Sequence, residues 1–366
     1  MIKRIAALAF ALLLCFGVLT CHAEGAPDSP RRTLIQAHRG ASSIAPENTM
    51  AAFHMAKAIG ADGIEMDIRM TKDHQLVLRH EDEIGFTSDS HGLISEMTLD
   101  ELKAVDFGQW YGPEYAGETI LTLEETLRVA KELDFQTLNL EMKPIGVNKK
   151  EFVHAIADVI EQSGLTERVM VSSFDSGLLK EMKRYAPNIS VALLTIPNLS
   201  ALSLIHLSDY LPGDKPLAEL TAEDVTDMPG MVPMLLSGFG ARGNSPEEIL
   251  IDVIKGIAAI APEGSSWNDV EALIFEQMNL ILYVDALDFR IDYLNCHYST
   301  LTEELMTAMH ERGIGVNVWT PDTKSTLENA LALNVDGIIT NKPEMALALR
   351  DQATAESTIE PSSAEN

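Results

Sequence analysis

The stretch GIEMDIRMTKDHQLVLRH, residues 63–80, decides the fold. Its first part, 63–68 (GIEMDI), has the alternating apolar pattern of a strand. A second apolar run, 76–80 (LVLRH), begins only seven residues after Arg69, whereas a parallel crossover needs about a dozen residues or more. The intervening TKDH at 71–74 favours a hairpin. We therefore expect 76–80 to fold back antiparallel and not to extend a parallel sheet.

Outside this hairpin, β-branched or apolar runs alternate with helical patterns along the chain. The predicted strands are 34–38, 63–68, 137–142, 168–174, 189–195, 293–298, 314–319 and 336–340. The predicted helices include 48–59, 122–133, 150–163, 176–186, 300–312 and 323–333. With 76–80 set aside, eight strands alternate with helices, which predicts an α/β fold of the closed (β/α)8, or TIM-barrel, type.

Two stretches are longer than such a barrel needs. Residues 81–117 follow the hairpin and carry a helical pattern near 99–105. Residues 196–290 lie between strands five and six and carry helical patterns near 246–261 and 267–279. Because long structureless loops are uncommon in compact domains, we expect the larger insertion to form a helical subdomain that caps the barrel.

The first 23 residues have the pattern of a secretory signal peptide. Lys3 and Arg4 precede an apolar run from Ile5 to Thr20, and Cys21-His22-Ala23 resembles a cleavage site. The apolar run is shorter than the ~20 residues that span a membrane, which disfavours a membrane anchor. Lipidation at Cys21 is the alternative to cleavage after Ala23. The pattern predicts a periplasmic or secreted protein.

The segments that flank the barrel differ from it in composition. Residues 24–33 are polar and contain two prolines, which predicts a flexible lead-in. Residues 351–366 (DQATAESTIEPSSAEN) are acidic and rich in serine and alanine, which predicts a disordered tail. The barrel is then expected to span 34–350. Cys296 is the only cysteine outside the leader, so no intramolecular disulfide is expected.

The net charge of the chain limits the classes of molecule that it can bind. The chain has 55 acidic and 27 basic residues and a formal net charge of −28. Such a surface repels phosphate polymers and anionic lipids, so nucleic-acid binding is not expected. An anionic substrate would need a local cation, supplied by buried bases or by a metal ion. The oligomeric state is left open.

Three carboxylates are predicted to converge inside the barrel. Glu65 and Asp67 are two residues apart on one strand and so share a face, and Glu141 lies on the next predicted strand. A solvent-facing charged strand is the alternative, but helices cover the outer face of a parallel barrel. Two carboxylates that point into one barrel interior repel each other, so either one of them is protonated or a cation lies between them. Three inward carboxylates from neighbouring strands make an all-oxygen site, which favours Ca²⁺ or Mg²⁺.

Two histidines are candidates for acid–base chemistry. His38 ends the first strand and His80 ends the hairpin, so both should lie at the barrel mouth, where such enzymes keep their active sites. Arg39 follows His38, and Lys143 shares a face with Glu141. A histidine pair can move protons near neutral pH, and the two bases can bind the equatorial oxygens of a phosphate. Together these residues indicate displacement at phosphorus.

The motifs in this order are similar to those of the glycerophosphodiester phosphodiesterase family. They are HRGASSIAPENTMAAF, GIEMDIRMTKD, LVLRHED, LNLEMK, VSSFD, VNVWTPD and VDGIITNKP. The resemblance covers about 34–195 and 293–349. It implies a TIM barrel, a divalent ion that is usually calcium or magnesium, and hydrolysis of glycerophosphodiesters to sn-glycerol 3-phosphate and an alcohol.

The resemblance also assigns residues. It implies that His38 and His80 form the acid–base pair, and we expect His38 to be the base and His80 the acid. It implies Glu65, Asp67 and Glu141 as metal ligands and Arg39 and Lys143 as phosphate-binding bases. The chain departs from the family where His-Asp is replaced by His80-Glu81, with Asp82 next, and where Gly85–Ser88 replaces Arg-Thr-Thr. Pro46 and Asn48 are interpreted as turn and helix-start residues without a chemical role.

Two aromatic residues are candidates for contact with the substrate. Trp319 and Phe174 end predicted strands and could pack on the glycerol backbone, although a structural role explains each equally well. His297 is a further candidate contact.

Three functions remain open from the sequence. The first is an exported, metal-dependent phosphodiesterase that acts on small glycerophosphodiesters. The second is a phospholipase D-type enzyme acting on lysophospholipids, and the third is a binding protein on an inactive barrel. No stable membrane span is expected.

Overall fold

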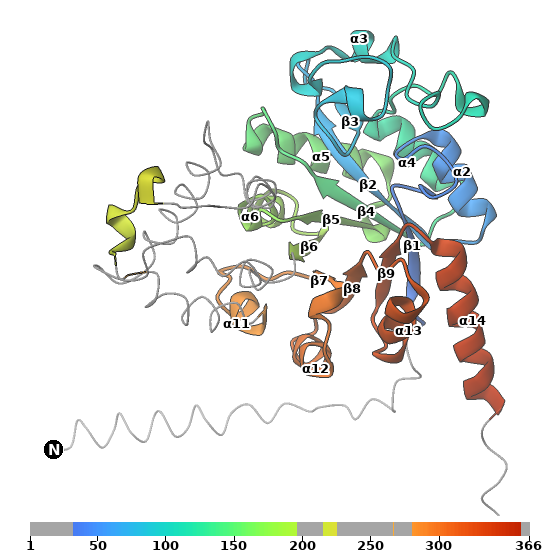
Figure 1. Cartoon of the computed structure of the whole chain (residues 1–366), viewed down its shortest axis with the longest axis vertical. Helices are drawn as coiled ribbons and strands as arrows, with labels where there is room; N and C mark the ends of the chain where they lie inside the picture. The colour runs from blue at the N-terminus through green and yellow to red at the C-terminus, as the bar shows by residue number, and fades with distance from the viewer. Residues whose placement is uncertain (1–31, 196–214, 225–265, 267–279, 360–366) are drawn as a thin grey trace, which may run out of the picture. The chain divides into compact units, whose positions relative to one another are not determined.

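The computed structural model describes residues 32–195, 215–224, 266 and 280–359, and its centre is a closed parallel barrel (Figure 1). The strands are β1 (Leu34–His38), β2 (Gly63–Met70), β3 (Leu76–Leu78), β4 (Thr137–Met142), β5 (Val169–Ser173), β6 (Ser190–Thr195), β7 (Tyr293–His297), β8 (Gly315–Trp319) and β9 (Gly337–Thr340). Their order is β1-β9-β8-β7-β6-β5-β4-β2-β3, and a β1–β2 pairing closes the ring. β3 pairs antiparallel with β2. The predicted eight-stranded barrel and the hairpin are confirmed.

The barrel forms because each strand has two different faces. Along β2, Ile64, Met66 and Ile68 are fully buried in the same hydrophobic cluster as Phe53 and Phe152 of the surrounding helices. Glu65 and Asp67 alternate with these apolar residues and therefore face the barrel interior. The apolar positions hold the helices on the outside, and the intervening positions are left for the site.

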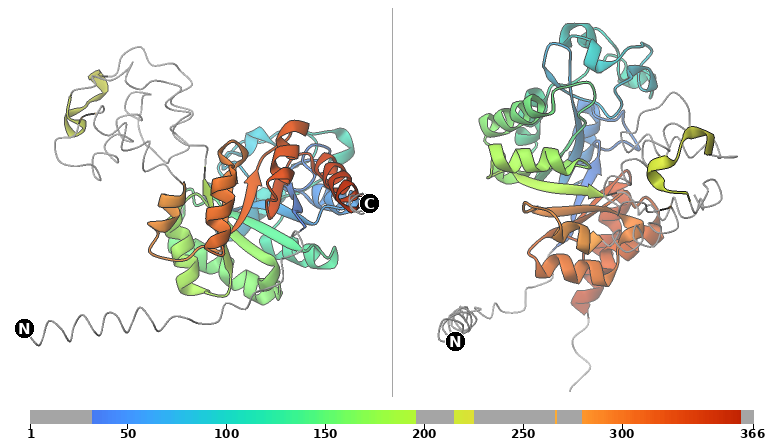
Figure 2. Two further views of the ribbon diagram at one scale, coloured as in Figure 1. Left: turned by 90° about the horizontal axis from the view of Figure 1, so that it is seen from below. Right: turned by 90° about the vertical axis from the view of Figure 1, so that its left-hand side faces the viewer.

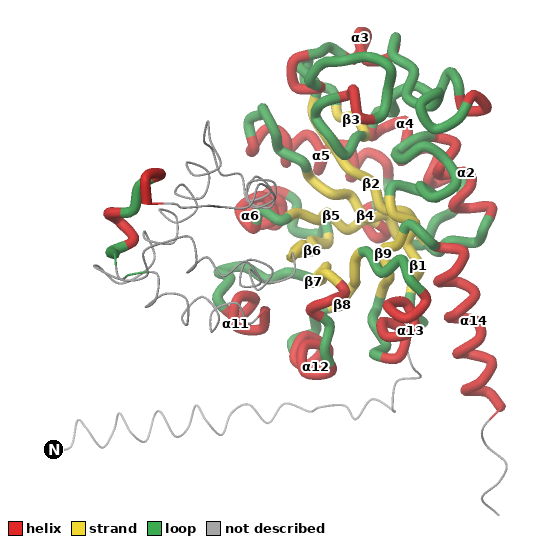
Figure 3. Tube along the Cα trace, in the orientation of Figure 1, coloured by secondary structure: helices red, strands yellow, loops and turns green. Residues whose placement is uncertain are grey.

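Helices surround the strands (Figures 2 and 3). They are α2 (Met50–Ala58), α4 (Leu123–Glu132), α5 (Lys149–Ser163), α6 (Ser176–Tyr185), α11 (Leu280–Asp285), α12 (Glu303–Glu311), α13 (Lys324–Ala332) and α14 (Pro343–Ile359). The side chains of Thr49, Thr122 and Asn148 accept hydrogen bonds from the first backbone N–H groups of α2, α4 and α5. These caps explain why the helices begin where the sequence predicts.

The insertion at 81–117 folds on β3 as a small unit with its own apolar cluster (Figure 1). It contains α3 (Leu99–Lys103) and three short 3-10 turns, Ile84–Phe86, Ile94–Glu96 and Pro113–Tyr115. Its cluster consists of Val77, Ile84, Ile94, Leu102, Phe107 and Ile120. The predicted helix near 99–105 is confirmed.

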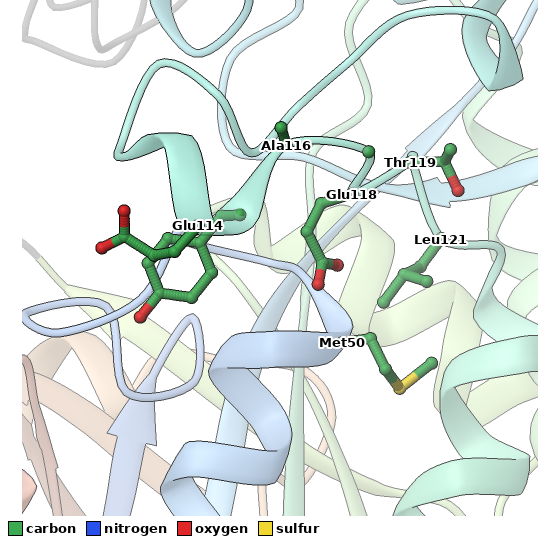
Figure 4. A pocket seen from close by; sticks show the side chains of 8 residues that line it. Met50, Glu114, Ala116, Glu118, Thr119 and Leu121 are labelled. Carbon is green, nitrogen blue, oxygen red and sulfur yellow. The ribbon is translucent and has the colours of Figure 1, made fainter.

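The segment that follows this insertion contacts the start of α2. The Glu118 carboxylate accepts hydrogen bonds from the backbone N–H groups of Met50 and Ala51. A hollow lies between Met50, Leu121 and residues 114–119 (Figure 4). It contains none of the predicted site residues, so the candidate chemistry lies elsewhere.

Most of the second insertion lies outside the described residues. This holds for the predicted helices at 246–261 and 267–279, for the leader 1–23 and for nearly all of the lead-in. A capping subdomain and a cleaved leader therefore stay predictions. Among the helices in the described ranges, none has the length and apolar character of a membrane span.

The expectation of a disordered tail from residue 351 is wrong as far as Ile359. α14 runs from Pro343 to Ile359 and begins with a proline, which suits the first helical position. The buried Arg350 side chain holds it to the barrel by an ion pair with Asp62 and by a 3.1 Å hydrogen bond to the Thr33 carbonyl. Composition alone missed this anchor, because its partners are nearly 300 residues away.

Candidate active site

The three predicted carboxylates converge inside the barrel. Asp67 on β2 is the register partner of Glu141 on β4, and Glu65 is two residues before Asp67. One oxygen from each of the three carboxylates lies within 4.8 Å of the other two. All three side chains are buried. The predicted convergence is confirmed.

The unsatisfied oxygens of this cluster fit a hard divalent cation. Glu65 Oε1 and Asp67 Oδ1 are buried and accept no hydrogen bond from any described residue, although Lys143 Nζ lies 3.3 Å from Asp67 Oδ1 as an ion-pair partner. Buried polar atoms almost always have a partner, and carboxylate oxygens are ligands that Ca²⁺ and Mg²⁺ prefer. Burial, together with the Asp67 and Glu141 carboxylates, raises the pKa of Glu65 well above its usual value. The cluster has the chemistry of a metal site.

Two basic side chains lie against the carboxylates. Lys143 Nζ lies 2.6 Å from Glu141 Oε1 and 3.3 Å from Asp67 Oδ1. Arg39 Nε lies 3.4 Å from Asp67 Oδ2, and Arg39 Nη1 donates a 2.9 Å hydrogen bond to Glu47. Burial acts to raise the pKa of Asp67, but Lys143 and Arg39 outweigh it and hold that pKa below its usual range. Arg39 and Lys143 therefore lie where a phosphate bound at the cluster needs positive charge.

The turn after β1 brings Arg39 to this position. Arg39 has φ +57° and Gly40 has φ +78°, and the Arg39 backbone N–H donates a 3.0 Å hydrogen bond to Glu65 Oε2. A Cβ at position 40 would lie 2.7 Å from Ala52 Cβ. Glycine is needed there both for the left-handed backbone and for the close approach of α2.

His38 projects over the cluster from the end of β1. Its Nε2 lies 3.7 Å from Glu65 Oε2, and its Nδ1 is 2.7 Å from Asn341 Oδ1. Burial, with the nearby Arg39 charge as the next cause, lowers the pKa of His38 from 6.5 to about 4. The ring is therefore neutral near pH 7, which is the form that can accept a proton.

His80 has a different partner. Its Nδ1 lies 2.6 Å from Glu81 Oε1, so the residue that departs from the family pattern contacts the histidine directly. The Arg69 guanidinium donates hydrogen bonds to the backbone carbonyls of Arg79 and His80 at 3.2 and 3.1 Å. These bonds fix the end of the hairpin. His80 also lies close enough to His38 and Asp67 for its charge to influence the pKa of both.

Phe174 and Trp319 are brought together at the carboxyl ends of their strands. Their rings meet edge to face with centroids 5.8 Å apart, and the His297 ring lies 5.0 Å from that of Trp319. Trp319 Nε1 donates a 3.1 Å hydrogen bond to the Asn295 carbonyl, and Phe174 is 45% exposed. The three rings form an aromatic wall, and the wall is partly open to solvent.

Sequence reasoning missed several polar residues of the site. Asn48, interpreted as a helix-start residue, is buried and donates a 2.9 Å hydrogen bond to Asp67 Oδ2. Asn341 contacts His38, and Asp322 in turn binds Asn341. Their position in the sequence could have identified two of these residues. Asn341 and Asp322 both follow barrel strands at their carboxyl ends, where barrel enzymes place functional residues.

Family models match both halves of the barrel. A model described as the glycerophosphoryl diester phosphodiesterase family matches residues 38–223, about half of the chain. A second model with the same description matches residues 315–344. The two matches include the end of β1 with His38 and the end of β9 with Asn341.

Curated relatives carry the corresponding name. A glycerophosphodiester phosphodiesterase of Caldanaerobacter subterraneus subsp. tengcongensis is 39% identical over 163 residues, which cover 44% of this chain and 67% of the relative. A glycerophosphodiester phosphodiesterase of Bacillus altitudinis is 27% identical over 320 residues, 87% of this chain and 99% of the relative. The likeness therefore extends beyond the N-terminal half.

Solved structures show the same fold. An Oleispira antarctica phosphodiesterase, in complex with the product sn-glycerol-3-phosphate, aligns with a TM-score of 0.59 at 23% identity over 87% of this chain and 96% of that chain. A glycerophosphoryl diester phosphodiesterase from Silicibacter pomeroyi aligns with a TM-score of 0.60 at 19% identity over 89% and 95% of the two chains.

Proposed function

The chain belongs to the glycerophosphoryl diester phosphodiesterase family, whose members are phosphodiester hydrolases, and from this premise we propose the substrate, the products and the residue roles. The protein hydrolyses glycerophosphodiesters to sn-glycerol 3-phosphate and an alcohol, with one divalent cation and the His38–His80 pair. The observation that carries the proposal is the buried three-carboxylate cluster with His38 Nε2 lying 3.7 Å from Glu65 Oε2.

Glu65, Asp67 and Glu141 hold the cation, which is Ca²⁺ or Mg²⁺. When bound, the cation draws negative charge from the phosphoryl oxygens and lowers the barrier to displacement at phosphorus. Arg39 and Lys143 bind the same phosphate from the protein side, since both already lie within 3.4 Å of the carboxylate cluster. Asn48 holds Asp67 in place through its side-chain amide.

The two histidines move the protons. Neutral His38 takes a proton at Nε2 from the attacking hydroxyl. If this hydroxyl belongs to water, sn-glycerol 3-phosphate forms directly. If it belongs to the neighbouring glycerol carbon, a cyclic phosphate forms first, and a water molecule must then open it to give sn-glycerol 3-phosphate. The new P–O bond forms as the bond to the alcohol breaks, and His80 donates its proton to the departing oxygen. The Glu81 carboxylate lies 2.6 Å from His80 Nδ1 and can hold the ring in one orientation. His38 has an uncharged amide partner, Asn341, and burial keeps its ring neutral.

The aromatic wall supports recognition of the glycerol carbons. Phe174 and Trp319 present apolar faces on strand ends that open at the same rim as β1 and β4, and His297 extends the wall. Carbon–hydrogen faces of a small polyol pack on such rings, while its phosphate binds the cation and the bases.

A second candidate is a lysophospholipid substrate, and three exposed apolar side chains on the segments that follow β1, β3 and β4 motivate it. Phe86 in the first insertion is 69% exposed, Ile145 after β4 is 55% exposed and Ile44 after β1 is 39% exposed. The acyl chain of a lysophospholipid would need apolar surface beside the site in order to leave water. A panel of glycerophosphocholine, glycerophosphoethanolamine, glycerophosphoglycerol and lysophosphatidylcholine, with identification of the products, distinguishes the two candidates. We expect sn-glycerol 3-phosphate from the first three; cleavage of lysophosphatidylcholine alone would favour the second.

A charge-neutral variant tests the metal ligands. Glu65→Gln keeps the size of the side chain and removes one anionic ligand, so the apparent affinity for Ca²⁺ or Mg²⁺ should fall at least tenfold, of the order seen for even indirect metal contacts. Glu132→Gln, which alters an exposed ion pair on α4, is the matched control. Unchanged metal affinity in the first variant, measured by calorimetry, would contradict the assignment.

Export is proposed from the leader alone. Residues 1–23 have the basic start, apolar core and cleavage-site pattern of a signal peptide. We place the mature protein in the periplasm or outside the cell, where glycerophosphodiesters released from phospholipids would reach it. Lipidation at Cys21 is the alternative outcome.

A further inference from the structure

Asp322 fixes the orientation of the Asn341 side chain. One carboxylate oxygen of Asp322 accepts a 2.9 Å hydrogen bond from the Asn341 backbone N–H, and the other accepts a 2.6 Å hydrogen bond from Asn341 Nδ2. If the amide were reversed, its oxygen would face a carboxylate oxygen, and two acceptors would repel each other. The Asn341 amide nitrogen is thus held on Asp322, and its oxygen points the other way.

The Asn341 oxygen faces His38. Asn341 Oδ1 lies 2.7 Å from His38 Nδ1 and accepts a 3.0 Å hydrogen bond from Ser42 Oγ. An amide oxygen only accepts hydrogen bonds, so His38 Nδ1 must carry the hydrogen. The other ring nitrogen, Nε2, then has its lone pair free, and Nε2 is the atom that lies 3.7 Å from Glu65 Oε2 at the carboxylate cluster.

We propose that Asp322 and Asn341 are positioning residues that set the tautomer of His38, so that the nitrogen over the carboxylate cluster is the one able to accept a proton. This inference rests on the proposed role of His38 as the base. Neither residue touches the carboxylate cluster, and both lie at the carboxyl ends of strands other than β1. The hydrogen-bonded series Asp322–Asn341–His38 is comparable to a catalytic triad, in which a third residue holds the base in the tautomer that can accept a proton.

A single isosteric substitution at Asp322 should turn the Asn341 amide over and reverse the tautomer of His38. In Asp322→Asn, the new amide keeps its oxygen where two donors already converge, Thr340 Oγ1 and the Asn341 backbone N–H. Its nitrogen then faces Asn341 Nδ2, and two donors repel each other. The Asn341 amide turns over, donates to His38 Nδ1, and leaves the hydrogen on Nε2. Asn341→Ala removes the acceptor altogether and should give a mixture of the two tautomers.

The readout is ¹⁵N NMR of histidine-labelled protein at about pH 8, where an ordinary histidine is neutral. The wild type should show a protonated Nδ1 and an unprotonated Nε2 for His38, assigned by its loss in His38→Asn. Asp322→Asn should exchange the two signals and lower kcat by about 10²-fold or more with KM little changed, because general-base catalysis is lost while the phosphate contacts remain. Circular dichroism and thermal unfolding check that each variant is folded.

Two controls separate this effect from structural damage. Ser42→Ala removes one donor to the same Asn341 oxygen without turning the amide, so the tautomer should stay as in the wild type. Asp285→Asn makes the same carboxylate-to-amide change in an exposed pair with Arg312 and should leave the signals and the rate unchanged. A folded Asp322→Asn or Asn341→Ala protein with the wild-type tautomer would overturn the inference. Wild-type activity in His38→Asn would instead overturn the proposed base.

Discussion

Replacing His38 by asparagine should change how stability depends on pH. Burial lowers the pKa of His38 from 6.5 to about 4 in the folded protein, whereas the unfolded chain keeps an ordinary value. As the pH falls, the unfolded chain takes up this proton first. The contribution of neutral His38 to folding is therefore complete above about pH 6.5 and is lost as the pH falls to about 4. Asparagine has no such proton to take up.

The size of this change in stability follows from the shift in the pKa of His38. At ~1.4 kcal/mol per pKa unit, the shift of His38 from 6.5 to about 4 corresponds to about 3 kcal/mol. The free energy of unfolding should thus fall by about 3 kcal/mol more in the wild type than in His38→Asn between pH 7 and pH 4. Urea unfolding of both proteins over this range measures the difference. A chelator is present throughout, so that metal release at low pH does not contribute.

The comparison between the two proteins removes most other titrations. Carboxylates that protonate in this range do so in both proteins, and their contributions largely cancel in the difference. Parallel curves for wild type and variant would refute the reasoning that His38 is held neutral by burial. In the wild type with saturating metal, protonation of His38 should not reduce kcat/KM near pH 6.5, the ordinary histidine value, because burial lowers the pKa of this base.

Four further predictions follow from the site and the fold. Exhaustive chelation should abolish turnover, and Ca²⁺ or Mg²⁺ should restore it; full activity without metal would exclude a metal-dependent mechanism. A p-nitrophenyl ester needs little acid assistance and should rescue His80→Ala more than His38→Ala in a rate assay, and equal rescue would contradict the assigned roles. Intact-mass analysis of the exported protein should give a chain that starts at Glu24, and a mass with a diacylglyceryl group would show lipidation instead. Arg350→Met should lower the free energy of unfolding by about 3–5 kcal/mol, because a buried carboxylate loses its cation, whereas Arg312→Met in an exposed pair should cost less than about 1 kcal/mol.

The parts of the fold that depend on local patterns could be predicted from the sequence. Alternation along β2 placed Glu65 and Asp67 on one face, and the short spacing before β3 identified the hairpin. Both follow from the period of a strand and from the minimum length of a crossover. The convergence with Glu141 needed only the assumption that consecutive parallel strands are neighbours, and the β2–β4 register bears this out.

What the sequence did not predict depends on contacts between distant residues. Asn341 binds His38 across 303 positions, and Arg350 binds Asp62 across 288. No periodicity or spacing connects such pairs. The tail is the clearest case. Its composition is that of a disordered segment, but the buried side chains of Ala346, Leu347 and Arg350, just before it, hold the helix on the barrel.

The separate packing of the insertion 81–117 on β3 affects which parts of the enzyme can change in sequence without loss of stability. The proposed acid, His80, ends a hairpin, and the insertion that follows contributes four of the six residues of a separate apolar cluster. The three carboxylates lie on strands that belong to the main barrel core. Substitutions in 81–117 should therefore alter the surroundings of His80, the proposed proton donor to the alcohol, with little effect on the packing that holds the three carboxylates. Directed evolution for a new leaving alcohol should thus accumulate its changes in this insertion, with little loss of thermal stability in the barrel.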